Sequence, residues 1–164
     1  DAVQSGQAEY GVLPIENTTA GSINESYDLL AHHALFLVGE VVQKVDHCLL
    51  ALEAMPVSHI RRVYSHPQAL AQCSAFLSSL RNCHAEAYSD TALAALKIKQ
   101  EQDFSQAAIA GEEAARIYGL TVLKRGIANQ RENYTRMVVV ARQPIAYDLR
   151  IPCKTSLIFA TSHE

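Results

Sequence analysis

The sequence predicts an α/β fold with substantially parallel sheets. Short apolar segments alternate along the chain with segments whose apolar residues recur at helical spacing, and this order is typical of strand–helix units. The chain has 164 residues, of which 49% are hydrophobic and 19% are charged. That length and composition predict one compact domain with a well-buried core, and they exclude a disordered chain.

The first third of the chain predicts a helix end followed by strands and one helix. Residues 1–5 resemble the last turn of a helix that Gly6 closes in the left-handed conformation. Apolar residues then fit a strand, a break rich in small polar residues, and a helical repeat. The expected elements are a strand over residues 10–15, a loop over 16–22, a helix from Ile23 capped by Ser22 or Gly21, and two strands or one bent strand over 34–42 and 45–52.

The middle and end of the chain repeat the strand–helix plan. Ser65 followed by Pro67 predicts a helix start, since proline suits the first helical position after a capping residue. Apolar residues continue that helix at the right spacing to Leu80. Further strands are expected over residues 60–64, 85–88, 107–110, 121–123 and 138–141. Further helices are expected over 93–98, preceded by a cap at 89–91, and over 112–118, closed by Gly119.

Charge and hydropathy restrict the partners. A net charge of −3 and a pI near 6.2 provide no basic surface for nucleic acid or an anionic membrane. The apolar runs are shorter than the roughly 18 residues that a membrane-spanning helix needs. The sequence therefore predicts a small molecule or a protein as partner, with no nucleic acid and no membrane.

The cysteines and histidines show no ligand spacing. Cys48, Cys73, Cys83 and Cys153 lie in apolar surroundings without a Cys-x-x-Cys pair, so we expect buried free thiols in a reducing cytoplasm. No phosphate-binding loop, dinucleotide fingerprint or nucleophile elbow is found. The sequence thus predicts no metal and no cofactor.

Uncharged donors collect where predicted strands give way to helices. In open α/β sheets, ligands bind beyond the carboxyl ends of the strands, where helix N-termini favour anions. Each such residue also suits an ordinary helix cap. Thr135 and Arg136 lie just before the strand expected over residues 138–141. There they could bind an anionic substrate, or they could be ordinary residues of a strand edge. The junction residues are Asn17, Thr18, Thr19, Ser22, Ser65, Ser89, Thr91 and Gly111, with Glu16 as a general acid or as a salt-bridged or solvated carboxylate.

Three segments together resemble the signature blocks of a known enzyme family. They are YGVLPIENTTAGS at residues 10–22, YSHPQ at 64–68 followed by Gln72, and NQRENYTR at 129–136. In this order they resemble prephenate dehydratases, nearest to the bacterial form in which a chorismate mutase domain is fused ahead of the dehydratase. Met137 stands where the family usually has Phe, and we expect this to alter packing more than chemistry.

The resemblance implies a fold and its partners. It implies two α/β subdomains with mixed sheets, arranged like type 2 periplasmic binding proteins, with prephenate in a cleft between them. Residues 1–143 would form the dehydratase domain without its N-terminal segment, and 144–153 would form a linker. Residues 154–164 resemble the first strand of a truncated ACT regulatory domain, through which L-phenylalanine acts in the family. A cytoplasmic homo-oligomer is expected.

The resemblance also implies residue roles. Thr135 would donate a hydrogen bond to the leaving hydroxyl of prephenate, while Asn17, Ser65 and Gln72 would position the ring substituents. Two rival functions stay open: an arogenate dehydratase, and a non-catalytic module that binds small anions. The remaining substrate-binding candidates are Thr18, Thr19, Ser89, Thr91 and Arg136.

Overall fold

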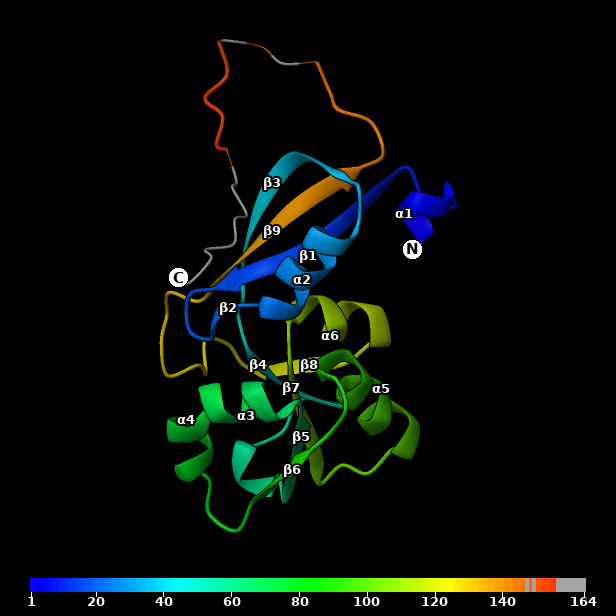
Figure 1. The fold of residues 1–164 in the computed structure, drawn as a ribbon. Helices are drawn as coiled ribbons and strands as arrows, with labels where there is room; N and C mark the ends of the chain where they lie inside the picture. The colour runs from blue at the N-terminus through cyan, green and yellow to red at the C-terminus, as the bar shows by residue number, and fades with distance from the viewer. Residues whose placement is uncertain (147, 149, 156–164) are drawn as a thin grey trace, which may run out of the picture. The chain divides into compact units, whose positions relative to one another are not determined.

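The computed structural model describes residues 1–146, 148 and 150–155, and the chain forms two compact units (Figure 1). Unit 1 combines Asp1–Gln43 with the chain from Tyr134 onward, and unit 2 is Lys44–Asn133. The α/β class with mixed sheets is confirmed. The two α/β subdomains that the resemblance implies are also confirmed, because each unit has its own sheet and its own hydrophobic core.

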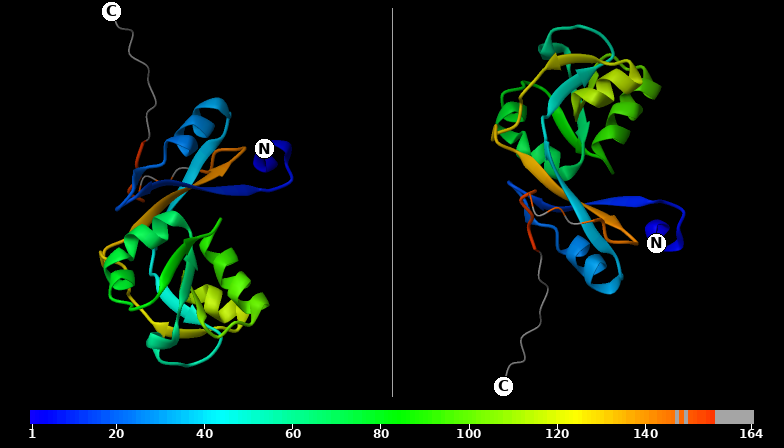
Figure 2. Two further views of the ribbon diagram at one scale, coloured as in Figure 1. Left: turned by 90° about the horizontal axis from the view of Figure 1, so that it is seen from below. Right: turned by 90° about the horizontal axis from the view of Figure 1, so that it is seen from above.

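Unit 1 is a four-stranded sheet in the order β2-β1-β9-β3. Strand β1 pairs antiparallel with both β2 and β9. Leu30 of α2 packs with Ile15 and Val138, and Figure 2 shows that helix along one side of the sheet. The elements are α1 (Ala2–Ser5), β1 (Tyr10–Asn17), β2 (Gly21–Ser22), α2 (Asn24–His32), β3 (Phe36–Lys44) and β9 (Tyr134–Ala141).

Unit 2 is a five-stranded sheet in the order β6-β5-β7-β4-β8. Strand β5 pairs parallel with β6 and β7, whereas β4 pairs antiparallel with β7 and β8. The elements are β4 (Cys48–Ala51), the 3-10 helix η1 (Val57–His59), β5 (Arg62–Ser65), α3 (Pro67–Gln72), α4 (Ser74–Ser78), β6 (His84–Ala87), α5 (Thr91–Glu101), β7 (Gln106–Ala110), α6 (Glu112–Tyr118) and β8 (Thr121–Lys124).

Helices cover both faces of the unit 2 sheet (Figure 1). Successive residues of a strand point to opposite faces, so Leu50 of β4 packs with Ile98 of α5, while Leu49 packs with Ala69 and Cys73 beside α3. All five side chains of β7 are buried. Coverage on both faces explains why the central strands read as continuous apolar runs rather than as alternating ones.

The structure corrects the predicted strand directions and lengths. The prediction of substantially parallel sheets is wrong for unit 1, where β1 pairs antiparallel with β2 and β9. In unit 2 it holds for β5 with β6 but not for β4 with β7. Strand β1 extends to Asn17 and β9 starts at Tyr134, because the residues taken as a loop and a strand mouth continue the ladder, with Asn17 opposite Thr135. The 34–52 segment forms two strands in different sheets.

The helix expected from residue 67 to 80 is broken at Cys73. In a continuous helix the amide of Ala75 would bond the carbonyl of Ala71. Instead, Asn129 Nδ2 donates to the Ala71 carbonyl at 3.2 Å, and Asn129 Oδ1 accepts from the Ala75 amide at 3.1 Å. One side chain therefore replaces the helical hydrogen bond and separates α3 from α4.

Two predicted caps are wrong and several helix boundaries are confirmed. Helix α2 starts after Ile23, without a side-chain cap, because Gly21 and Ser22 pair with β1 instead. Helix α3 is capped by His66, whose Nδ1 accepts from the Gln68 amide, rather than by Ser65. Pro67, the left-handed glycines that close α1 and α6, and the Ser89–Thr91 start of α5 agree with the prediction.

The four cysteines are free, as predicted, but not all are buried. Cys48 and Cys73 are buried, Cys83 is half-buried, and Cys153 is exposed. Burial raises the pKa of the Cys73 thiol to about 12, so this thiol is unreactive at neutral pH. Within the described residues, none of the helices has the length and apolar character needed to cross a bilayer. The strand expected near the C-terminus lies largely outside the described residues.

Candidate functional site

Asn17 and Thr135 form the polar end of the central strand pair in unit 1. They lie opposite each other on β1 and β9. Asn17 Nδ2 donates to Thr135 Oγ1 at 3.1 Å and to the Tyr134 carbonyl at 3.2 Å. Asn17 Oδ1 accepts from Thr19 Oγ1 at 2.6 Å and from the amides of Thr19 and Ala20, both at 3.0 Å. The buried Asn17 amide thus fixes both the turn after β1 and the Thr135 hydroxyl.

This arrangement sets the direction of the Thr135 hydroxyl. A hydroxyl can donate one hydrogen bond and accept others. Because Thr135 Oγ1 accepts from Asn17, its own hydrogen must point in another direction. Thr135 is half-buried at the start of β9. The geometry therefore holds the Thr135 oxygen in place with its hydrogen directed away from Asn17, and the role of this hydroxyl toward a substrate stays a prediction.

Thr18 secures the same end of the sheet. Its amide donates to the Tyr134 carbonyl at 2.9 Å, and its Oγ1 accepts from the Tyr134 amide at 2.9 Å. The loop after β1 is therefore clamped to the first residue of β9. Thr18 and Thr19 have structural partners here, and their contact with substrate stays a prediction.

Arg136 is engaged by carboxylates of its own unit. Its Nη2 lies 2.7 Å from Glu40 Oε2 on β3, and its Nη1 lies 3.6 Å from Glu16. Glu40 also pairs with Lys154 at 2.8 Å. The hydrogen bond from Lys154, followed by that from Arg136, lowers the pKa of the Glu40 carboxyl. A substrate carboxylate would have to compete with Glu40 for this guanidinium, so the binding role of Arg136 stays a prediction.

In unit 2, Ser65 closes strand β5. It is fully buried, and its hydroxyl donates to the Ile109 carbonyl of β7 at 2.6 Å. The hydroxyl hydrogen is thereby used to join two strand ends. Ser65 can offer a ligand only its remaining lone pairs, and its substrate contact stays a prediction.

Gln72, at the end of α3, belongs to a buried polar cluster. Its Oε1 accepts from His47 Nε2 at 2.7 Å and from Asn133 Nδ2 at 3.2 Å. Its backbone carbonyl accepts from the Asn129 amide at 2.7 Å. His47 was not predicted, since nothing in its local sequence distinguishes it. Asn129 and Asn133 lie in a signature block but received no role, and their partners are distant in the sequence.

The start of helix α5 carries its own negative charge. Asp90 accepts from the amides of Ala92 at 2.7 Å and Leu93 at 3.1 Å. Ser89 is exposed and Thr91 is half-buried on either side of it. Because Asp90 occupies the positive end of this helix, an anion bound there would meet a like charge. The predicted role of Ser89 and Thr91 in binding a carboxylate stays untested.

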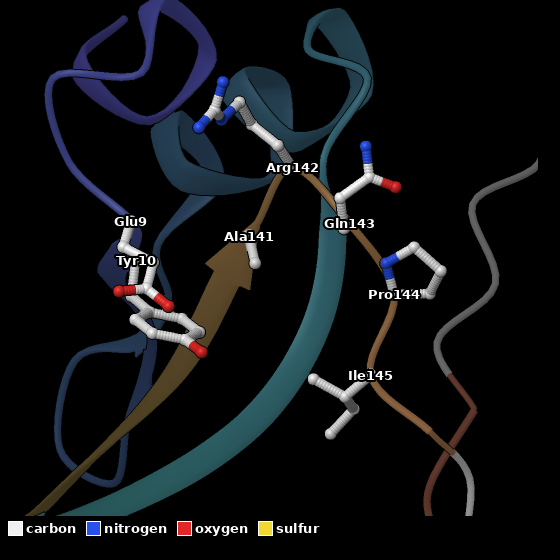
Figure 3. A pocket seen from close by; sticks show the side chains of 7 residues that line it. All are labelled: Glu9, Tyr10, Ala141, Arg142, Gln143, Pro144 and Ile145. Carbon is white, nitrogen blue, oxygen red and sulfur yellow. The ribbon is translucent and has the colours of Figure 1, made fainter.

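A separate pocket of about 230 Å³ lies at the opposite end of the β1–β9 pair (Figure 3). It is beside the Tyr10–Ala141 pairing, whereas the Asn17–Thr135 pairing is at the other end. The Arg142 guanidinium lies against Gly6. None of the predicted site residues lines this pocket; its lining is Glu9, Tyr10, Ala141, Arg142, Gln143, Pro144 and Ile145. Within the described chain, no group of three metal-ligating side chains comes together.

The fold and these clusters define a two-unit α/β protein with a hydroxyl and an amide held in buried polar networks. The chain belongs to the prephenate dehydratase family, whose model matches residues 1–145. This family assignment agrees with the resemblance of the three signature blocks.

Two curated relatives cover nearly the whole chain. The bifunctional chorismate mutase/prephenate dehydratase of Escherichia coli K12 is 45% identical over 162 residues, which are 99% of this chain and 42% of the relative. Arogenate dehydratase 1 of Petunia hybrida is 46% identical over 164 residues, which are 99% of this chain and 38% of the relative. The chain therefore spans about two-fifths of the length of the curated relatives it matches.

Two solved structures share the fold. The prephenate dehydratase of Arthrobacter aurescens in complex with L-Phe has a TM-score of 0.78 and 28% identity, covering 89% of this chain and 50% of that one. A protein described as GqqA, a novel type of quorum quenching acylase, has a TM-score of 0.78 and 33% identity, covering 90% of this chain and 53% of that one. Both solved structures therefore resemble the fold of this chain over about nine-tenths of its length.

Proposed function

We propose that this chain provides the catalytic residues of a prephenate dehydratase, a carbon–oxygen lyase of phenylalanine biosynthesis. The observation that best supports this proposal is the hydrogen bond from Asn17 Nδ2 to Thr135 Oγ1. It fixes a hydroxyl whose hydrogen can bond to a leaving oxygen. Family membership and the Escherichia coli relative support this choice of substrate.

The reaction needs little strong acid or metal chemistry. In prephenate, the ring carboxylate leaves as carbon dioxide, and the electron pair of the broken C–C bond moves into the ring. The ring C–O bond then breaks and the hydroxyl leaves as hydroxide, which gives phenylpyruvate. Aromatisation supplies the driving force. The protein must orient a dianion and stabilise charge on the departing oxygen, and preorganised neutral donors suit that task.

In this mechanism Thr135 donates to the departing oxygen. A threonine hydroxyl is a poor acid, so its contribution is a directed hydrogen bond rather than full proton transfer. Asn17 holds that hydroxyl, and Gln72 and Ser65 position ring substituents. Arg136, Ser89 and Thr91 are assigned to substrate carboxylates, and Thr18 and Thr19 are assigned to substrate binding.

The proposal extends to regulation and partners. The relative named for two activities supports a fused chorismate mutase domain. The Arthrobacter structure with L-Phe supports phenylalanine as an effector. As the resemblance implies, we assign its action to an ACT domain that begins at residue 154. A homo-oligomer in the cytoplasm completes the proposal, and sedimentation with and without phenylalanine would test the assembly.

A second candidate is arogenate dehydratase, which the 46% identity to the Petunia enzyme favours. Arogenate carries an amino-acid side chain where prephenate carries a keto acid. We expect the full-length protein to form phenylpyruvate from prephenate, measured by absorbance, with a higher kcat/KM than for arogenate. A higher kcat/KM for arogenate would replace the primary proposal with the second. Binding of prephenate without turnover would instead indicate a non-catalytic anion-binding module.

A further inference from the structure

The polar cluster of His47, Gln72 and Asn133 joins three segments of unit 2. His47 lies just before β4, Gln72 ends α3, and Asn133 is the last residue of the unit. His47 is 6% exposed and Asn133 is 1% exposed. The chain that leads to Asn133 is also attached to this cluster, since the Ile127 amide donates to the His47 carbonyl at 3.2 Å. The cluster is therefore built into the unit rather than lying on its surface.

The hydrogen bonds determine which atom carries the imidazole hydrogen. A carbonyl oxygen such as Gln72 Oε1 can only accept, so His47 Nε2 must donate across the 2.7 Å contact. Asn133 Nδ2 is the second donor to the same oxygen, at 3.2 Å. The reverse orientation of the Gln72 amide would set its NH2 against the NH2 of Asn133. His47 and Asn133 therefore fix the orientation of the Gln72 amide, whose NH2 group points away from His47.

The other nitrogen of the ring shows that packing alone does not account for a histidine here. His47 Nδ1 is buried and has no hydrogen-bond partner in the described part of the chain. A buried, unpaired polar atom is unfavourable. An apolar ring would fill the same space without that penalty. The hydrogen bond from Nε2 to Gln72 is thus the interaction that an imidazole adds at this position.

We propose that His47 is a positioning residue for Gln72, which it holds so that the Gln72 amide NH2 donates to the ring substituents of the substrate. This inference rests on the proposed dehydratase function, in which Gln72 contacts prephenate. His47 itself touches no substrate in this account. It acts through the amide that it orients.

The test measures kcat for prephenate in the full-length protein with four variants. His47→Phe keeps a planar ring and removes the donor, and we expect a loss of about tenfold, the size of one typical hydrogen bond. His47→Gln carries an NH2 where the imidazole has Nε2, so it should recover most of the activity. His47→Asn carries its NH2 nearer the position of Nδ1 and should not. The exposed His84→Phe is the matched control and should retain wild-type kcat.

A double-mutant cycle separates positioning from a purely structural role. In a Gln72→Ala background, His47→Phe should cause no further loss of kcat, because the oriented amide is already gone. Equal losses in both backgrounds, equal activities for His47→Gln and His47→Asn, or wild-type kcat in His47→Phe would each overturn the inference. If the wild-type protein forms no phenylpyruvate, the proposed function fails instead, which is a distinguishable result.

Discussion

Each unit has a polar cluster built around a side-chain amide, but the two clusters use different atoms of that amide. In unit 1, the Asn17 NH2 donates to Thr135, and this leaves the threonine hydrogen to point elsewhere. In unit 2, the Gln72 oxygen accepts from His47 and Asn133, and this sets the amide NH2 on the opposite edge. Each unit therefore has an amide side chain whose orientation is fixed by its hydrogen-bond partners.

The difference lies in what holds each donor. The unit 1 cluster depends on strand pairing and a tight turn, because Asn17 and Thr135 are register partners in the ladder. The unit 2 cluster depends on no strand register: the Gln72 side chain at the end of α3 is held by the side chains of His47 and Asn133, and the Gln72 carbonyl accepts from the Asn129 amide. A substitution in the unit 1 cluster should therefore lower kcat strongly. A substitution in the unit 2 cluster should lower kcat less and should also lower the free energy of unfolding.

The largest effect is expected for Asn17→Asp. The new carboxylate can still accept from Thr19 and Ala20, but it has no hydrogen to give to Thr135. The threonine should then donate to this carboxylate rather than to the substrate, and kcat should fall by about 10³, as for the loss of a preorganised donor. Steady-state kinetics checks the fall. The melting temperature should also fall, because the carboxylate can no longer donate to the Tyr134 carbonyl, and circular dichroism at the assay temperature checks that the variant is folded. A kcat within about threefold of the wild type would show that the orientation of Thr135 does not matter.

A smaller effect, on stability, is expected for Asn129→Ala in unit 2. Asn129 bonds the Ala71 carbonyl, the Ser74 hydroxyl and the Ala75 amide. Removing this bridge should lower the free energy of unfolding by about 1 kcal/mol, since the exposed backbone groups regain water. Denaturant titration measures the change. The neighbouring exposed Gln130→Ala is the control, and an equal loss there would contradict the role of Asn129.

The smallest effect concerns Glu40 and pH. The hydrogen bonds from Lys154 and Arg136 lower the pKa of Glu40 in the folded protein. A lowered carboxyl pKa contributes stability above the unfolded value of about 4.3, and that contribution disappears as pH falls through the folded pKa. The melting temperature of Glu40→Gln should lie below the wild type near pH 7 and converge with it below about pH 4. The exposed Glu53→Gln should match the wild type throughout, and a Glu40→Gln difference independent of pH would refute the link.

Local signals in the sequence predicted most elements but not their assembly. Pro67, Gly6 and Gly119 mark helix ends because their backbone preferences act over a few residues. The antiparallel pairing of β1 with β9 and the break between α3 and α4 were not predicted. Both depend on distant partners, as in the contact of Asn129 with Ala71, which are 58 residues apart in the sequence.

For the candidate site, the sequence predicted individual residues but not the partners that hold them. Asn17, Thr135 and Gln72 followed from the signature blocks, and the structure places each in a polar network. His47 was missed because its partner Gln72 lies 25 residues away and its own surroundings resemble an ordinary strand start. The ion pair of Glu16 with Arg136 agrees with one of the readings left open for Glu16, whereas Glu40 was missed, since ion pairs between strands leave no periodic trace in a sequence.

The proposed mechanism depends on the hydrogen bond that Thr135 donates to the departing oxygen of prephenate. It is tested most directly by kcat for phenylpyruvate formation by full-length Thr135→Ala beside Thr135→Ser, with both variants checked for folding. We expect a loss of about 10² to 10³ for alanine and activity near that of the wild type for serine, which restores the hydroxyl. Wild-type kcat in Thr135→Ala would show that this hydrogen bond is not needed for the reaction.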